Sequence, residues 1–140
     1  MTRTKGQTMT KTTKLICGKN IQHDASRVGM DAIRSAMDEY NECCDGVSGY
    51  SLLRSLQGAI RDAVQDIADR HGCILSDETA GSGSYYISLD RDDADGDADV
   101  SIKIRVADHS ARYSNEWSFA PTDTDKSVLF GLATIERLCQ

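Results

Sequence analysis

The stretch YSLLRSLQGAIRDAVQDIADRHGCILSDE, residues 50–78, decides the fold because its hydrophobic period changes within it. Up to Gly72 the apolar residues recur at helical spacing. This buried stripe consists of Leu53, Leu56, Ile60, Val64 and Ile67. Gly72 stands where a glycine commonly follows the last turn of a helix. After it the pattern alternates, as in a strand with one buried face. The stretch therefore predicts a helix over 50–72 followed by a strand over 73–78.

A second helix is predicted on the N-terminal side of this stretch, over residues 24–44. Its apolar face consists of Met30, Ile33, Met37 and Tyr40. The turn residues at 45–49 leave only a short connection, so we expect an antiparallel helical hairpin. Residues 1–13 show no apolar period and are predicted to form a flexible basic leader. The remaining residues, 14–140, are expected to form a single domain.

Three further segments on the C-terminal side alternate between apolar and polar residues, at 84–90, 100–108 and 112–119. They predict half-buried antiparallel strands. The last segment, 122–140, returns to helical spacing, with an apolar face of Val128, Leu132, Ile135 and Leu138. Because helices and strands are segregated along the chain, the class is α+β. We predict an N-terminal helical hairpin, an antiparallel meander of three to four strands, and a C-terminal helix packed on the sheet.

The charge is distributed unevenly along the chain. The net charge is −6, yet residues 1–20 hold five basic side chains and no acidic one. The rest of the chain is therefore strongly acidic, which disfavours direct contact with nucleic acid or with anionic membranes. We expect the partner to be a protein complex with a basic surface.

The sequence lacks the features of secreted, membrane-spanning or cofactor-binding chains. No apolar run resembles a signal peptide or approaches the roughly 20 residues of a membrane span. The five cysteines are odd in number, so we expect reduced thiols and a cytoplasmic protein that binds no membrane. No nucleotide-binding glycine motif occurs, and the histidines and cysteines lack zinc-site spacing. We therefore expect no cofactor, no metal and no enzymatic activity.

The stretch LDRDDADGDADVS, residues 89–101, is the most unusual part of the sequence. Its aspartates are Asp90, Asp92, Asp93, Asp95, Asp97 and Asp99. A calcium loop of the EF-hand type with Gly96 at position 6 would need oxygen ligands at positions 1 and 12. Those positions hold Arg91 and Ile102, so the frame fails. Two interpretations remain: a solvated hairpin loop, or a polyanionic surface for a basic partner.

Our leading hypothesis follows the second interpretation. The chain would be a small non-enzymatic protein that binds and inhibits a host nucleic-acid-handling or defence complex, as anti-CRISPR proteins and DNA mimics do. Its binding surface would be the six loop aspartates, supported on the second helix by Asp62, Asp66 and Asp69. The short length and the Thr/Lys-rich leader are typical of small phage or mobile-element proteins, so we expect a phage origin.

The alternative hypothesis places the function on the outward face of the sheet. We expect Tyr86, Lys103, Arg105 and Arg112 to lie together there. An aromatic ring among cations can stack a base and hold phosphates, so this face would bind a nucleotide or nucleic acid. With either hypothesis, an uncovered sheet edge could pair with a second copy of the chain, and a homo-oligomer is possible.

Overall fold

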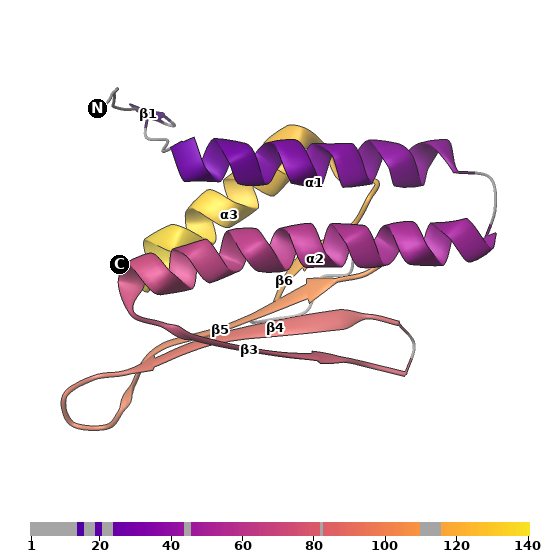
Figure 1. Ribbon diagram of the computed structural model, residues 1–140. Helices are drawn as coiled ribbons and strands as arrows, with labels where there is room; N and C mark the ends of the chain where they lie inside the picture. The colour runs from indigo at the N-terminus through magenta and orange to yellow at the C-terminus, as the bar shows by residue number, and fades with distance from the viewer. Residues whose placement is uncertain (1–13, 16–18, 21–23, 44–45, 82, 110–115) are drawn as a thin grey trace.

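The computed structural model describes residues 14–15, 19–20, 24–43, 46–81, 83–109 and 116–140 (Figure 1). In chain order the elements are β1 (Lys14–Leu15), β2 (Lys19–Asn20), α1 (Asp24–Glu42), α2 (Gly46–His71), β3 (Ile74–Thr79), β4 (Tyr85–Asp92), β5 (Ala98–Val106), β6 (Glu116–Phe119) and α3 (Asp125–Cys139). The predicted leader, residues 1–13, lies outside the described residues. The helices lie on one side of a four-stranded sheet, so the predicted α+β class is confirmed.

The two N-terminal helices form the predicted antiparallel hairpin, and α2 runs between α1 and the sheet (Figure 1). They approach closely, because a Cβ placed on Gly29 would lie 3.5 Å from Cβ of Ala63. The predicted stripe of α2 is buried throughout. The helix ends at His71, and Gly72 follows with φ +69°, so the predicted glycine signal is confirmed. Among the described residues, no helix combines the length and the apolar character needed to cross a membrane.

The sheet has the strand order β3-β4-β5-β6, and its last strand corrects the sequence prediction. The β3–β4 and β4–β5 pairs are antiparallel as expected. In contrast β6 pairs with β5 in parallel, from Lys103 opposite Glu116 to Val106 opposite Phe119. The predicted meander is therefore wrong at its last step, because an antiparallel β6 was expected there and β6 is parallel to β5. Alternation reports which face of a strand is buried, and it carries no information on strand direction.

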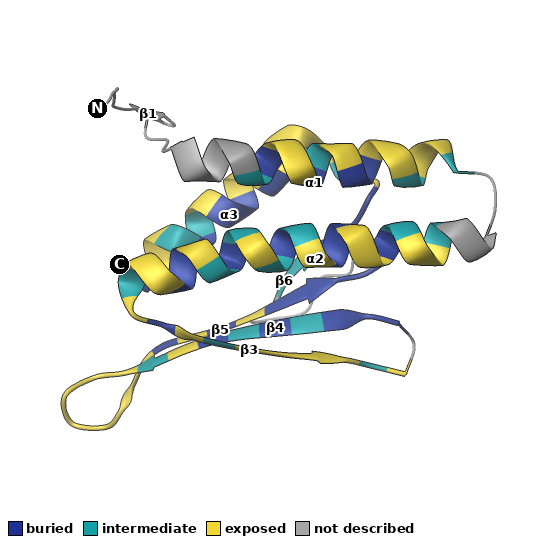
Figure 2. Cartoon of the chain, viewed as in Figure 1, coloured by how far each residue is buried: buried dark blue, intermediate teal, exposed yellow. Residues whose placement is uncertain are grey.

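The hydrophobic core fills the space between the helices and the inner face of the sheet (Figure 2). Ile87, Leu89 and Ile104 on the strands are almost fully buried, as are several residues of α2 and α3. The apolar face predicted for the last helix is correct except for Leu138, which is 51% exposed. Cys139 is buried in its place, because the last turn of α3 presents that side chain to the core.

Candidate functional site

The aspartate-rich stretch forms the turn of a β-hairpin, as the hairpin interpretation predicts. Strands β4 and β5 pair up to Asp92 opposite Ala98. In the turn, the carboxylate of Asp93 accepts the backbone N–H of Asp95 at 2.9 Å and that of Asp97 at 3.0 Å. Gly96 takes φ +86°, a conformation that glycine adopts at little cost. The sequence thus specifies this turn locally, through one Asx-type carboxylate and one glycine.

All six aspartates are exposed, and the hairpin carries them beyond the ends of the helices (Figures 1 and 2). Two of the six carboxylates have a structural task. That of Asp93 holds the turn, and that of Asp99 forms an ion pair with Arg91 at 2.8 Å. The other four belong to Asp90, Asp92, Asp95 and Asp97. Among the described residues these four make no side-chain hydrogen bond or ion pair, so their charge faces solvent.

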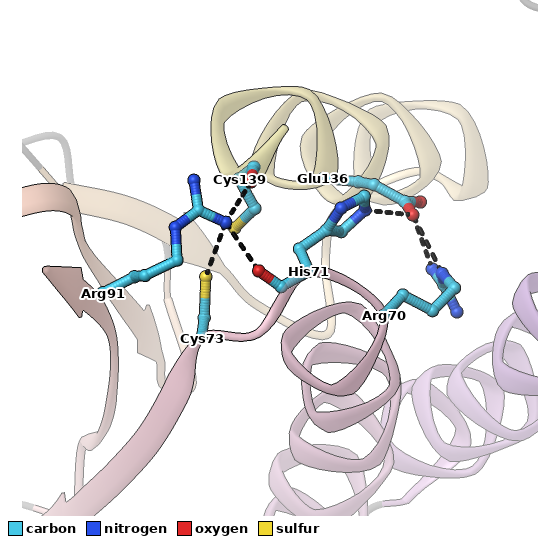
Figure 3. A network of polar contacts seen from close by, with 6 residues as sticks. All are labelled: Arg70, His71, Cys73, Arg91, Glu136 and Cys139. Atoms are coloured by element: carbon cyan, nitrogen blue, oxygen red, sulfur yellow. Dashed lines mark hydrogen bonds and ion pairs between the residues drawn. The ribbon is translucent and has the colours of Figure 1, made fainter. Parts of the chain in front are cut away.

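The base of the hairpin is attached to two helices through Arg91 (Figure 3). Its Nη1 donates to the carbonyl of His71 at 2.5 Å and to that of Cys139 at 2.8 Å. These carbonyls close the C-terminal ends of α2 and α3, where a cation is favoured by the helix dipole. The hydrogen bond to Asp99 is the largest cause that raises the pKa of Arg91. The guanidinium therefore stays charged and holds the hairpin base against the helical layer.

A change of register explains how Asp99 reaches Arg91. Arg91 lies opposite Val100, but Asp92 lies opposite Ala98, so Asp99 has no residue directly across from it. Such a bulge twists the hairpin and redirects one side chain. Sequence reasoning missed this role and counted Arg91 only as a residue that breaks a calcium frame. The alternation of the strand was an available signal. Arg91 lies two residues after Leu89 and so falls on the same inward face as Tyr85, Ile87 and Leu89.

The three supporting aspartates lie on α2 and are exposed. Asp62, Asp66 and Asp69 follow helical spacing on the side of α2 opposite its buried stripe. Asp69 accepts from Nε2 of Gln65 at 2.9 Å. They form a separate stripe from the hairpin turn, and the stripe ends two residues before His71, the residue whose carbonyl contacts Arg91.

The structure brings only part of the alternative sheet-face set together. Nζ of Lys103 lies 5.7 Å from the ring centroid of Tyr86, and Arg105 pairs with Tyr86 across the strands. However, Arg105 is only 5% exposed, and its Nη1 donates to the carbonyl of His109 at 2.8 Å. The expectation of a solvated Arg105 is therefore wrong, because this side chain is buried and bonds the backbone just after β5. The fourth residue, Arg112, lies outside the described residues.

Two side chains at the end of α2 contact one carboxylate of α3. His71 and Arg70 both contact Oε2 of Glu136, at 2.9 Å in each case (Figure 3). Within the ranges that the structure describes, no three His, Cys, Asp or Glu side chains gather as the ligands of a metal would. Strand β3 forms one edge of the sheet. Pairing of that edge with a second copy stays a prediction.

Comparison of the chain with protein-family models, with curated proteins and with solved structures gave no match.

Proposed function

We propose that this chain is a small acidic protein that binds a basic surface on a host nucleic-acid-handling or defence complex and inhibits that complex without catalysis. The mode of action would resemble that of anti-CRISPR proteins and DNA mimics. The observation that supports it most is the hairpin turn, with four carboxylates that have no structural task among the described residues. The proposed setting is the cytoplasm of a bacterial cell, and the proposed origin is a phage.

The spacing of the hairpin carboxylates suits a surface that normally binds phosphates. Alternate residues of a strand lie about 7 Å apart and point to the same side. Asp90 and Asp92 have this relation on β4. The turn adds Asp95 and Asp97, so four exposed carboxylates lie on this one hairpin. This charge density is on the order of that along a nucleic-acid backbone, and it is what a phosphate-binding groove recognises.

The attachment of the hairpin base favours tight binding. A flexible acidic loop would lose conformational entropy when a partner ordered it, and that loss would weaken the complex. Here Arg91 joins the hairpin base to the ends of α2 and α3, and Asp93 holds the turn from within. The exposed carboxylates are therefore presented on a preorganised element.

The experiment is a tagged pull-down from bacterial lysate, at low and high salt and after nuclease treatment, read by mass spectrometry. We expect one stoichiometric protein complex that survives nuclease and dissociates as salt rises, because exposed charges are screened. The triple variant Asp92→Lys, Asp95→Lys and Asp97→Lys should lose this complex. It leaves Asp93 and Asp99 in place, so the hairpin should still form.

A matched control changes the net charge by the same amount elsewhere. Asp38, Glu39 and Glu42 are exposed on α1, and all three can be replaced by lysine. This control should keep the complex. Equal loss in both triple variants would show that net charge alone governs capture, and equal retention would show that the hairpin is not the binding surface. A third triple variant, at Asp62, Asp66 and Asp69, measures the contribution of the α2 stripe.

The alternative function, a nucleotide or nucleic-acid binding module on the sheet face, has the Tyr86–Lys103 pair in its favour. It loses support because Arg105 is buried and bonded to the backbone. Absorbance near 260 nm that copurifies with the wild type and disappears in Tyr86→Ala would favour this module over the acidic surface.

A further inference from the structure

A hollow of about 370 Å³ lies between the N-terminal half of α2 and the turn from β3 to β4, away from the acidic hairpin. We call it the Gln57 hollow. Its lining consists of Tyr50, Leu53, Arg54, Gln57, Gly58, Thr79, Gly83 and Tyr85. This volume lies within the range of about 300–1,000 Å³ that small-molecule sites occupy. No local sequence pattern predicts this hollow, because one wall comes from α2 and the other from the end of β3 and the start of β4.

The first observation that points to a ligand is a buried acceptor without a partner. Gln57 is 7% exposed, and its Nε2 donates to the carbonyls of Gly83 and Val106, both at 3.0 Å. Carbonyl oxygens only accept, so these two bonds fix which end of the amide is the nitrogen. The oxygen Oε1 then has no hydrogen-bond donor among the described residues. Buried polar atoms are normally satisfied, so Oε1 is an acceptor that an N–H or O–H group of a ligand can satisfy.

The second observation is a glycine in the middle of a helix. Gly58 lies within the 26 residues of α2, although glycine is among the poorest helix formers. A Cβ placed on Gly58 would meet no atom within 4 Å. No close packing therefore requires a glycine there. Because Gly58 has no side chain, the hollow stays open beside Gln57.

The third observation is the charge of the lining. The chain holds 22 acidic residues against 16 basic ones, yet no carboxylate is present among the described residues that line this hollow. Among the described lining residues the one charged side chain is Arg54, whose guanidinium lies 4.9 Å from the ring centroid of Tyr50. Behind the lining, Tyr85 donates to Asp77, and Nε of Arg61 contacts the same carboxylate at 3.1 Å. The negative charge of Asp77 is therefore paired with Arg61, and its carboxylate is also bonded by Tyr85. The charge that a ligand in the hollow would meet is that of Arg54.

We propose that the Gln57 hollow binds a small organic anion that also carries a hydrogen-bond donor. The anionic group pairs with the guanidinium of Arg54, and an N–H or O–H of the ligand donates to Oε1 of Gln57. Phosphomonoesters such as nucleoside monophosphates and carboxylates such as amino acids share this chemistry. The site is separate from the acidic hairpin and does not depend on the function proposed for it.

The test is calorimetric titration of the full chain with nucleotides and with amino acids. Two further titrations use compounds that carry only the donor or only the anion. The probes are the four ribonucleoside 5′-monophosphates, L-glutamate and L-aspartate. Adenosine supplies donors without an anion, and inorganic phosphate supplies an anion without an organic body. We expect saturable binding by members of one source, with much weaker binding of adenosine and phosphate. Either the nucleotides or the amino acids would then be identified as the ligand class.

Two variants test whether the ligand binds in the hollow. Gly58→Leu fills the space while improving the helix, so it should abolish binding and leave the melting temperature equal or higher. Arg54→Gln should weaken binding at least about tenfold, since it removes a charge-assisted bond. Arg137→Gln, an exposed arginine on α3, is the control and should bind as the wild type does.

Three results would overturn the proposal. The first is that no probe binds at millimolar concentration. The second is that inorganic phosphate binds as well as the organic probes, which would mean an adventitious ion only. The third is that Gly58→Leu binds as tightly as the wild type. None of these results bears on the acidic hairpin, because its test uses a different surface and different variants.

Discussion

The contacts of Gln57 allow a sharp prediction about stability. The side chain extends from α2, and its Nε2 bonds both the turn after β3 and the end of β5, at Gly83 and Val106. Gln57→Leu removes both bonds while keeping a side chain of similar size. Each net hydrogen bond contributes about 1 kcal/mol, which sets a loss of about 2 kcal/mol. A carbonyl left buried without a donor raises the loss toward about 4 kcal/mol.

The assay is equilibrium unfolding in urea, followed by circular dichroism. A domain of this size has a slope of roughly 2 kcal/mol per molar urea, so the midpoint should fall by about 1–2 M. The matched control is Gln65→Leu on the same helix, whose Nε2 contacts only Asp69 on the surface. That variant should change the unfolding free energy by no more than about 0.5 kcal/mol. If both variants unfold at the same urea concentration, Gln57 does not join the helix to the sheet as described.

Three further outcomes follow from the structure. Gly131→Ala should lower the unfolding free energy by about 1 kcal/mol, although alanine is the better helix former. The new Cβ would lie 2.8 Å from the buried ring of Phe119. Urea unfolding measures this change, and a stabilised variant would contradict it. Hydrogen bonds from the Tyr85 hydroxyl and then from an arginine lower the pKa of Asp77 below its ordinary value of 3.8. The stabilisation that the Asp77 carboxylate provides should therefore be complete above pH 3.8 and be lost as the pH falls through the lowered pKa, so the stability gap between wild type and Asp77→Asn should close on acidification; a gap that widens in acid would refute this. Burial raises the pKa of the Cys139 thiol to about 12. Iodoacetamide at pH 8 should therefore alkylate this thiol far more slowly than a fully exposed cysteine, as measured by peptide mass spectrometry. Equal rates would contradict its burial.

The hairpin turn between β4 and β5 could be predicted from local sequence alone. Asp93 and Gly96 carry both the side-chain acceptor and the conformational freedom that this turn needs, and the two flanking strands alternate clearly. No distant residue is required to explain why the chain turns there. The exposure of the six aspartates also follows, since charged side chains at a turn stay in water. The position and character of the proposed binding surface were therefore predictable.

The residues around the hairpin base and the Gln57 hollow were not predictable in this way. Arg91 contacts carbonyls 20 and 48 residues away in the chain, and Gln57 contacts carbonyls 26 and 49 residues away. A polar residue next to a buried stripe has the same local pattern whether it faces water or bonds a distant backbone group. For Arg105, the alternating pattern predicted an exposed side chain, whereas in the structure this side chain is buried and bonds the carbonyl of His109.

The sequence by itself determined helices α1 to α3, strands β3 to β5 and the hairpin turn between β4 and β5. These depend on the period of apolar residues, on glycines such as Gly72 and Gly96, and on side chains that bond their own neighbours. The tertiary structure alone decided the parallel pairing of β6, the attachment of Arg91 to two helix ends, and the hollow beside Gln57. Each of these joins segments that are far apart in the chain, and a local pattern contains no information about which distant segment will complete it.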